Sequence, residues 1–360
     1  MSSAPSIEAL TAALRRIPDP HRGGDIVTSG AVRELRIETG KARFLLALVE
    51  PASEKAQATL AAAERAAMAV PGVAEVSARV VQAAPKASDG LPQKQAIPGT
   101  RRVVAVSSGK GGVGKSTVCV NLACAMQLAG DHVGVLDGDI YGPDIPLMLG
   151  VKGKPQGSGD KLFPFVAHGM QVMSMGMLVP EDQPMIWRGP MLNKAVQQFM
   201  FQVDWHDLDW LFVDMPPGTG DVQLTLTQNT DITGAVVVTT PQDVSVLDVR
   251  KAVRMFERID VPVLGVVENM SWFQPPGSTE RYELFGSGGG ERIAREFGIP
   301  LLGQIPIGIP VREGGDRGAP ITLTDPDGEI GKAFRAAARR MVERVREMET
   351  ANPSRSRPQP

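Results

Sequence analysis

The sequence predicts an α/β protein in which a parallel sheet carries helices on both faces, with a small α+β domain in front of it. Two observations predict this. From Arg101 onward, short apolar runs recur and each is followed by a helical stretch, whereas residues 1–82 lack that alternation. Runs that are apolar on both sides, alternating with helices, indicate parallel strands buried on both faces. The runs are 103–106, 133–136, 210–213, 235–238, 263–267 and 301–305.

Residues 1–82 are expected to form the small domain. A helix opens at Ile7 and stops at the proline-containing residues 17–20. Alternating strands and an alanine-rich helix follow, at 32–37, 42–49, 56–69 and 73–80, with a turn at 39–40.

The rest of the chain divides by composition. Residues 83–100 contain three prolines and two glycines among short polar runs, which predicts a linker. Residues 101–350 form the large domain, closed by a helix at 328–348 whose apolar positions recur every three to four residues. The polar, proline-rich residues 351–360 are expected to be a disordered tail.

The composition limits the possible partners. The 360 residues carry a net charge of -2, which predicts no general attraction to nucleic acid or anionic lipid. Aromatic residues make up 5%, and no apolar run has the length of a membrane span or a signal peptide. Two cysteines, five positions apart, make neither a disulfide framework nor a metal-ligand spacing, so we expect a cytoplasmic protein.

Residues 109–116, GKGGVGKS, match the phosphate-binding pattern G-x-x-x-x-G-K-[ST]. A predicted strand precedes the loop, and a predicted helix at about 115–129 follows it. Glycines let backbone N–H groups turn toward phosphate oxygens, and the helix N-terminus adds partial positive charge. Lys115 would neutralise the β- and γ-phosphates, and the Ser116 hydroxyl would bind Mg²⁺. The sequence therefore predicts an ATP site.

Three aspartates follow predicted strands and are candidate metal and catalytic groups. Asp137 and Asp139 come after the run 133–136, and Asp214 ends the run 210–213. Alternate residues of a strand share a face, so Asp137 and Asp139 can both point toward the loop. Asp214 is typical of the acid that holds Mg²⁺ in such ATPases. Gly218, soon after it, offers a backbone N–H to the γ-phosphate.

Lys110 is a second lysine within the loop. It is not needed for the nucleotide that Lys115 holds, so its charge could act on the nucleotide of a partner subunit, as an arginine finger does. The alternative is a solvated loop lysine.

These stretches resemble a known family. The loop is similar to the deviant Walker A sequence of the MinD/ParA-like ATPases, and within that class residues 101–325 resemble the Mrp (ApbC) iron–sulfur cluster carrier proteins. Residues 1–82 resemble, more weakly, the small domain that often precedes the ATPase in that family. The strings that carry the likeness are LDGDIYGP at 136–143, WRGPM at 187–191, VDMPPGTGD at 213–221, TPQ at 240–242 and ENMS at 268–271.

The resemblance implies a homodimer that holds two ATP molecules between its subunits. Lys110 would reach the partner's nucleotide, Asp139 would position the attacking water, and Asp137 would support Mg²⁺. Asn269 would read the adenine, and apo-proteins that receive a cluster would be the partners. The nucleotide-binding candidates are Gly109, Lys110, Gly111, Gly112, Val113, Gly114, Lys115, Ser116, Thr117, Gly218 and Asn269.

The chain departs from the family at the cluster ligands. Relatives usually carry C-P-x-C after ENMS, and two cysteines from each subunit supply the four thiolates of a [4Fe–4S] cluster. Here the same positions are Pro275 and Ser278, and neither side chain offers a thiolate. Ser53 likewise stands where relatives often have a cysteine. No iron–sulfur ligand is therefore identified.

Cys119 and Cys124 do not replace the missing ligands. Five residues along a helix correspond to about 500°, so the two thiols point well apart. We interpret both as small buried core residues.

We expect an ATP-hydrolysing iron–sulfur cluster carrier or assembly protein. One alternative is an ATP-dependent client-binding switch without a cluster. Another is a positioning ATPase of the MinD/ParA kind, which would need a membrane-seeking helix or a DNA-binding face. The arginines of the helix at 328–348 are diluted by glutamates, so we expect this helix to pack on the sheet.

Overall fold

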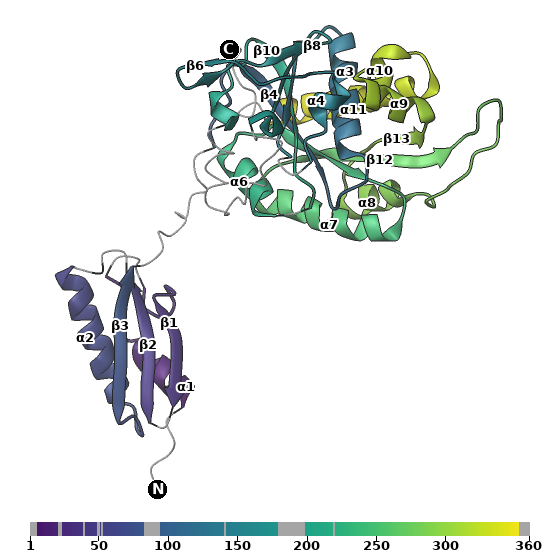
Figure 1. Ribbon diagram of the computed structural model, residues 1–360. Coiled ribbons are helices and arrows are strands. Elements are labelled where there is room, and N and C mark those ends of the chain that lie inside the picture. The colour runs from purple at the N-terminus through teal and green to yellow at the C-terminus, as the bar shows by residue number, and fades with distance from the viewer. Residues whose placement is uncertain are drawn as a thin grey trace. The chain divides into compact units, whose positions relative to one another are not determined.

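The structure is a computed structural model, and it describes residues 6–20, 24–38, 40–48, 51, 53–82, 94–139, 142–178, 199–218 and 220–352. The chain divides into two compact units, Met1–Pro92 and Gln93–Pro360, which are described separately (Figure 1).

The first unit is a three-stranded sheet with two helices on one face. Strand β2 lies in the centre, antiparallel to β1 and parallel to β3. Apolar side chains of both helices and of the sheet face beneath them form one core, and Ser6 and Ser53 cap the two helices through their hydroxyls. The predicted elements are all present, with ends shifted by a few residues. They are α1 (Ile7–Leu14), β1 (Val32–Glu38), β2 (Lys41–Leu48), α2 (Glu54–Met68) and β3 (Glu75–Gln82).

The second unit is built on an eight-stranded sheet. The strand order is β13-β12-β11-β4-β10-β5-β9-β8, and every neighbouring pair except β9 and β8 is parallel. All six predicted apolar runs are strands here. The bounds are β4 (Thr100–Ser108), β5 (Val133–Asp137), β8 (Phe165–Ala167), β9 (Met170–Ser174), β10 (Leu208–Asp214), β11 (Gly234–Thr239), β12 (Val263–Phe273) and β13 (Leu301–Ile307).

The predicted parallel sheet is confirmed, and the structure adds two strands at its edge that the sequence did not predict, β9 and β8, of which β8 runs antiparallel to β9. Ala167 pairs with Met170, so only His168 and Gly169 connect the two strands. Both residues have positive φ, 52° and 78°, as a two-residue hairpin turn requires. The strands have three and five residues and lack a long apolar run, and a His-Gly turn is a weaker signal than Asn-Gly.

Helices cover both faces of the large sheet, as predicted. Helices α3, α4, α10 and α11 contribute to the core on one face, and α6, α7 and α8 contribute to the core on the other. The helix bounds are α3 (Lys115–Leu128), α4 (Ile145–Met148), α6 (Asp221–Asn229), α7 (Asp243–Arg258), α8 (Gly289–Phe297), α9 (Ile309–Arg317), α10 (Ile321–Thr324) and α11 (Glu329–Ala351). The unit also contains a 3-10 helix, η1 (Met175–Leu178), and a small hairpin, β6 (Gly157–Ser158) and β7 (Lys161–Leu162).

The expected linker at 83–100 is too long at its C-terminal end. The backbone N–H of Gln95 donates to Asn229, and the backbone oxygen of Gln95 accepts from Asp231. Ile97 is buried in the core of the second unit. Residues 94–99 therefore belong to the large unit, while 83–93 lie outside the described residues, as do 353–360 of the expected tail.

Helix α11 packs on the sheet, as expected. Phe334, Ala337, Met341 and Val345 are buried in the core that α11 shares with α3 and β13. Among the helices that the structure describes, none is long and apolar enough to cross a membrane.

Candidate functional site

The glycine-rich loop lies between β4 and α3, and its glycines meet two separate demands. Gly114 has φ +80°, and a Cβ there would lie 2.2 Å from Asn269 Nδ2. A Cβ on Gly109 would lie 2.2 Å from the carbonyl carbon of Asp248. Residues with a Cβ rarely adopt such a φ, and the loop has no room for a side chain at either position. The predicted strand, loop and helix thus occur together.

Three predicted residues form one hydrogen-bonded group at the start of α3. The Lys115 ammonium donates to Asp214 Oδ1 over 2.6 Å, and the Ser116 hydroxyl donates to Asp214 Oδ2 over 2.6 Å. Lys115 Nζ also lies 3.3 Å from Ser116 Oγ. Asp214 ends β10, next to β4, so the sheet itself brings this acid to the loop. All three side chains are buried.

Asp137 and Asp139 lie beside this group. Asp137 accepts a backbone hydrogen bond from Asp139 over 3.1 Å and a hydroxyl hydrogen bond from Ser174 over 3.0 Å. Asp139 accepts the backbone N–H of Gly142 over 3.2 Å. Burial and then the charge of Asp214 raise the pKa of Asp137 to about 8. Burial also raises the pKa of Asp214, against the opposing effect of Lys115. Two buried carboxyls therefore lie close together, and the one ammonium group beside them, that of Lys115, does not balance the charge of both.

Ser174 is a site residue that the sequence reading missed. It ends β9 and pairs with Asp137 across the sheet. The strand was not predicted, so nothing in the sequence placed this hydroxyl at the site.

Glu268 was also missed, although it opens the ENMS string. Its buried carboxylate accepts the Gly290 N–H over 2.6 Å, the Ser271 hydroxyl over 2.9 Å and the Gln304 amide over 3.0 Å. These bonds fix the part of β12 that presents Asn269. Glu268 is therefore a positioning residue, which a family string can flag but whose partners a sequence cannot give.

Asn269 contacts the loop directly. Its Nδ2 donates to the backbone oxygen of Val113 over 2.9 Å, which holds β12 against the loop. Asn269 and Thr117 also line a cavity of about 380 Å³ with apolar and polar walls. Further lining residues include Asp144, Met148, Pro306 and Gly308.

The remaining loop candidates differ in their backbone bonds. The Gly218 N–H, expected to meet a phosphate, donates to the backbone oxygen of Ser108 over 3.1 Å, so a phosphate contact would have to replace that bond. Lys110 is half-buried, and its backbone oxygen accepts the Ser108 hydroxyl over 2.9 Å. Within the described residues its ammonium has no ion pair. The string at 187–191 and residues 140, 141 and 219 lie outside the described residues.

The segment after β12 carries the two positions where relatives have cysteines. It leaves the sheet beyond the end of β12 and returns to it, and Phe273 and Tyr282 are bridged by backbone hydrogen bonds (Figure 1). The N–H of Ser278 donates to the backbone oxygen of Pro275 over 3.1 Å, and the Ser278 hydroxyl accepts from Glu280 over 3.0 Å. The described residues contain no group of three or more His, Cys, Asp or Glu side chains that could hold a metal ion.

The two cysteines are core residues, as predicted. Both are fully buried on α3. Burial raises the pKa of Cys119 well above its ordinary value and that of Cys124 to about 12. Thiolates, which bind iron, are therefore strongly disfavoured at both positions.

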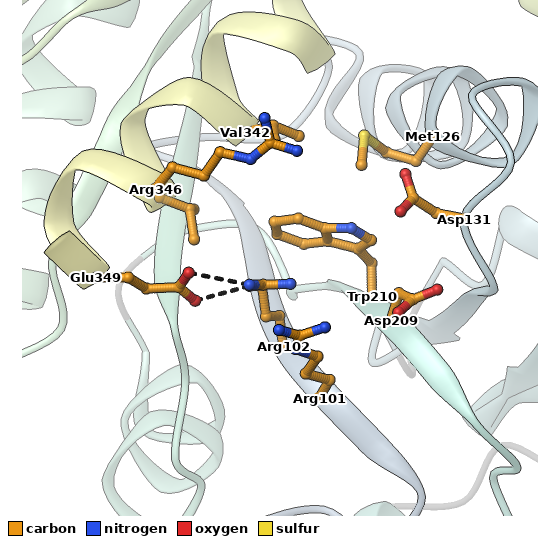
Figure 2. Close-up of a pocket in the computed structure, with 10 residues that line it drawn as sticks. Arg101, Arg102, Met126, Asp131, Asp209, Trp210, Val342, Arg346 and Glu349 are labelled. Carbon is orange, nitrogen blue, oxygen red and sulfur yellow. Dashed lines mark hydrogen bonds and ion pairs between the residues drawn. The ribbon is translucent and has the colours of Figure 1, made fainter. Parts of the chain in front are cut away.

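A second cavity, of about 370 Å³, lies at the opposite end of the strands from the loop, where β4 and β10 begin (Figure 2). Arg102 lies over the ring of Trp210, 4.9 Å from its centroid, and donates two hydrogen bonds to Glu349 of α11. Arg346, Asp131 and Asp209 lie around them (Figure 2). This group joins the end of α11 to the sheet and is far from the loop along the strands.

Two family models match the chain. One, described as the NUBPL iron-transfer P-loop NTPase, matches residues 99–342, and one described as an iron–sulfur cluster assembly protein matches residues 7–78.

Similar proteins cover most of the chain. The iron–sulfur cluster carrier protein of Synechocystis is 46% identical over 346 residues, which is 94% of this chain and 97% of that protein. The iron–sulfur cluster transfer protein NUBPL of Mus musculus is 45% identical over 262 residues, 72% of this chain and 82% of that protein.

Solved structures show the same fold. A nucleotide-binding protein from Archaeoglobus fulgidus in complex with ADP has a TM-score of 0.57 and 37% identity, and the match covers 65% of this chain and 92% of that one. The cell division ATPase MinD of Pyrococcus furiosus has a TM-score of 0.52 and 22% identity, over 67% of this chain and 98% of that one.

Proposed function

Since the chain belongs to the family of NUBPL-type iron-transfer P-loop NTPases, we propose that it binds and hydrolyses ATP to drive iron–sulfur cluster assembly or transfer. The observation that carries the ATP part is the buried group of Lys115, Ser116 and Asp214 behind a glycine loop. Its cellular setting is the cytoplasm, and its partners are apo-proteins.

The loop of residues 109–116 holds the phosphates. Backbone N–H groups and the N-terminus of α3 face them, and Lys115 exchanges its bond to Asp214 for the β- and γ-phosphate oxygens. Asn269 and Thr117 line the cavity that takes the base or ribose. Asn269, which donates to the backbone oxygen of Val113, would also contact the adenine.

The residues present fit a magnesium ion. Ser116, Asp137 and Asp214 supply hard oxygen ligands, which Mg²⁺ prefers. Burial raises the pKa values of Asp137 and Asp214, so a divalent cation would be the natural charge partner of the two carboxylates. When bound, Mg²⁺ neutralises charge on the phosphates. With Asp214 among the residues that would hold the ion, Lys115 would be available to the phosphates.

Hydrolysis requires a positioned water and compensation of the developing charge. Asp139 would orient the water that attacks the γ-phosphorus, while the bond to the bridging oxygen breaks and yields ADP and phosphate. Lys110 would supply charge to the nucleotide of the partner subunit, which makes hydrolysis dependent on a homodimer. Its half-exposed side chain, with no ion pair in the described part of the chain, supports this role.

The two loop lysines separate binding from hydrolysis. We expect Lys115→Ala to abolish ATP binding, whereas Lys110→Ala should keep ATP affinity within about threefold and slow hydrolysis by roughly a hundredfold. Binding is measured by calorimetry and hydrolysis by phosphate release, with light scattering to follow dimer formation. Equal loss of ATP binding in both variants would reject the role of Lys110 across the dimer.

The residues at the family's cluster position do not fit a cluster. Pro275 and Ser278 offer no thiolate, and both cysteines are buried with raised pKa values. If this chain carries a cluster, a partner or another segment must supply ligands. Anaerobic reconstitution followed by iron and acid-labile sulfide assays tests the carrier role. Absence of both, with no transfer to an apo-acceptor, would refute it.

The second candidate function is an ATP-dependent client-binding switch without a cluster, which the two non-cysteine positions favour specifically. It predicts normal ATPase activity and ATP-dependent capture of a client with no iron bound. A positioning ATPase that binds a membrane through α11 is disfavoured, because the apolar stripe of this helix is buried in the core.

A further inference from the structure

The first unit has one covered and one open sheet face. Helices α1 and α2 pack on one face, and the opposite face forms a shallow depression of about 450 Å³. Four arginines, one from the centre strand, one from β3 and two from β1, belong to the open face. They are Arg33, Arg36, Arg43 and Arg79, and all four side chains are exposed.

A β-bulge brings the two arginines of β1 to the same face. Arg33 and Arg36 are three residues apart, so regular alternation would point them in opposite directions. The register shifts between them, so that Arg33 pairs with Leu45 and Arg36 with Arg43. Leu45 and Arg43 are two residues apart and share a face, and therefore their partners do too. Glu34, inside the bulge, has φ +53°.

The pairing with β3 completes the cluster. Arg43 pairs with Ser77, and Leu45 pairs with Arg79. The face thus has one row that places Arg36 beside Arg43 and a second row that places Leu45 between Arg33 and Arg79.

The positive charge of this face exceeds the negative charge beside it, because Glu34 is the one acidic residue among the described residues that line the depression. None of the four guanidinium groups has a hydrogen bond or ion pair within the part of the chain that the structure describes, although Lys41 at the end of the same sheet is paired with Glu75. Like charges directly opposite each other, as at Arg36 and Arg43, destabilise a sheet. An arrangement that costs stability and aims charge at solvent indicates a ligand.

We propose that this open face binds an acidic segment of a partner protein. Each guanidinium can hold a carboxylate through two parallel hydrogen bonds. Leu45, half-buried between Arg33 and Arg79, gives an apolar contact in the middle of the patch. The segment that fits best has two or more carboxylates around an apolar side chain.

A protein segment fits this face better than a nucleic acid does. Phe44 is the sole Phe, Tyr or Trp of residues 1–92, and it is buried, so no ring is available for base stacking. Residues 1–92 contain eleven Lys and Arg against ten Asp and Glu, so no wide positive field surrounds the patch. Three strands and two residues along each give a patch of roughly 10 by 7 Å, about the size of one peptide turn.

The test uses the full chain and a fluorescein-labelled peptide of repeated Glu-Glu-Leu as probe. The double variant Arg43→Gln with Arg79→Gln should bind this peptide roughly tenfold more weakly in fluorescence anisotropy. Binding to the unaltered chain should weaken as salt is added. The melting temperature of the double variant should stay equal or rise, because the repulsion between Arg36 and Arg43 is removed.

The matched control makes the same charge change on the helical face, at the exposed residues Lys55 and Arg65 of α2, both changed to Gln. It should leave peptide affinity unchanged. Equal weakening in the control, or no peptide binding by the unaltered chain, would overturn the proposal. Tighter binding of oligo-dT or of phosphatidylserine vesicles through Arg43 and Arg79 would reassign the face to that class of partner.

Discussion

Two ion pairs lie at opposite ends of the central strands β4 and β10 and differ in what surrounds them. Lys115 and Asp214 meet where β4 and β10 end, with side-chain exposures of 7% and 0%. Arg102 and Glu349 meet near the start of the same strand β4, with exposures of 15% and 21% (Figure 2). The first pair is buried beside another carboxyl, Asp137, and the second is bidentate and reaches solvent.

The pKa shifts of the two acids have opposite signs. Burial raises the pKa of Asp214, because Lys115 does not fully offset the loss of water. The hydrogen bond from Arg102 lowers the pKa of Glu349. An acid with a raised pKa keeps an unmet demand for positive charge, which a cation can satisfy, while an acid with a lowered pKa is already satisfied. The pair of Lys115 and Asp214 therefore has the properties of a ligand-binding site, whereas the pair of Arg102 and Glu349 has those of a structural ion pair.

The largest effect is expected from Lys115→Met. It removes the phosphate-binding charge, so ATP affinity should fall at least a hundredfold, or about 3 kcal/mol. It also leaves the Asp214 carboxyl buried without its partner, which should cost about 3 kcal/mol of the free energy of unfolding. Calorimetry and urea unfolding measure the two losses.

A double variant separates those two roles of Lys115. Lys115→Met combined with Asp214→Asn removes the orphaned charge, so most of the lost stability should return while ATP binding stays absent. Recovery of ATP binding in the double variant would contradict the assignment of Lys115 to the phosphates.

The next largest effect is expected from Gly114→Ala. The new Cβ would clash with Asn269 Nδ2 and occupy a φ of +80°, at a combined cost of about 2 to 3 kcal/mol in unfolding free energy. Gly112→Ala is the matched control, because Gly112 has a similar φ of +78° while a Cβ there has nothing within 4 Å. Similar losses for both, measured by thermal melting, would show that loop strain rather than the Asn269 contact sets the cost.

The extent to which the sequence predicts the site follows from the range of each signal. The loop motif lies within eight consecutive residues, so its glycines and Lys115 could be named directly. Asp214 could be named because the carboxyl ends of parallel strands lie on the same side of the sheet, whatever the order of the strands. Ser174 could not, because its strand is short and its role depends on pairing with Asp137.

The fold was predictable to the same degree for the same reason. The six buried strands could be predicted because each is a local apolar run. The conformations of the antiparallel edge strand β8 and of residues 94–99 depend on contacts with distant parts of the chain, which a local pattern does not contain. The β-bulge at Glu34 likewise could not be predicted from the alternation of polar and apolar residues in β1, because it is defined by the pairing register with β2.

Asp137→Asn should have a smaller effect with the opposite sign. The folded pKa of Asp137 is raised to about 8, so the contribution of this carboxyl to wild-type stability is most favourable below about pH 4 and is lost as the pH rises to about 8. The asparagine does not titrate, so its advantage should grow over that window and reach about 2 kcal/mol above pH 8 in magnesium-free buffer. Urea unfolding at pH 5 and pH 9 measures it, and a pH-independent difference would contradict the buried charge. ATPase activity should fall, because a magnesium ligand is lost.

The smallest effect is expected at the opposite end of the strands from the loop, from Arg102→Gln. This change removes the stacking on Trp210 and the bidentate bond to Glu349, and a partly exposed pair of this kind should cost about 1 kcal/mol. The lowered pKa of Glu349 means that the pair stabilises the fold above the ordinary value near 4.5 and loses this contribution as the pH falls through the folded pKa. The loss of unfolding free energy in Arg102→Gln should therefore shrink in acid. The gain of unfolding free energy in Asp137→Asn should shrink in acid as well. Lys251→Gln, which breaks an exposed pair with Asp248, is the control and should change the melting temperature very little. ATP affinity should be unchanged in Arg102→Gln. A loss of ATP affinity in this variant would show that the two ends of the strands are coupled.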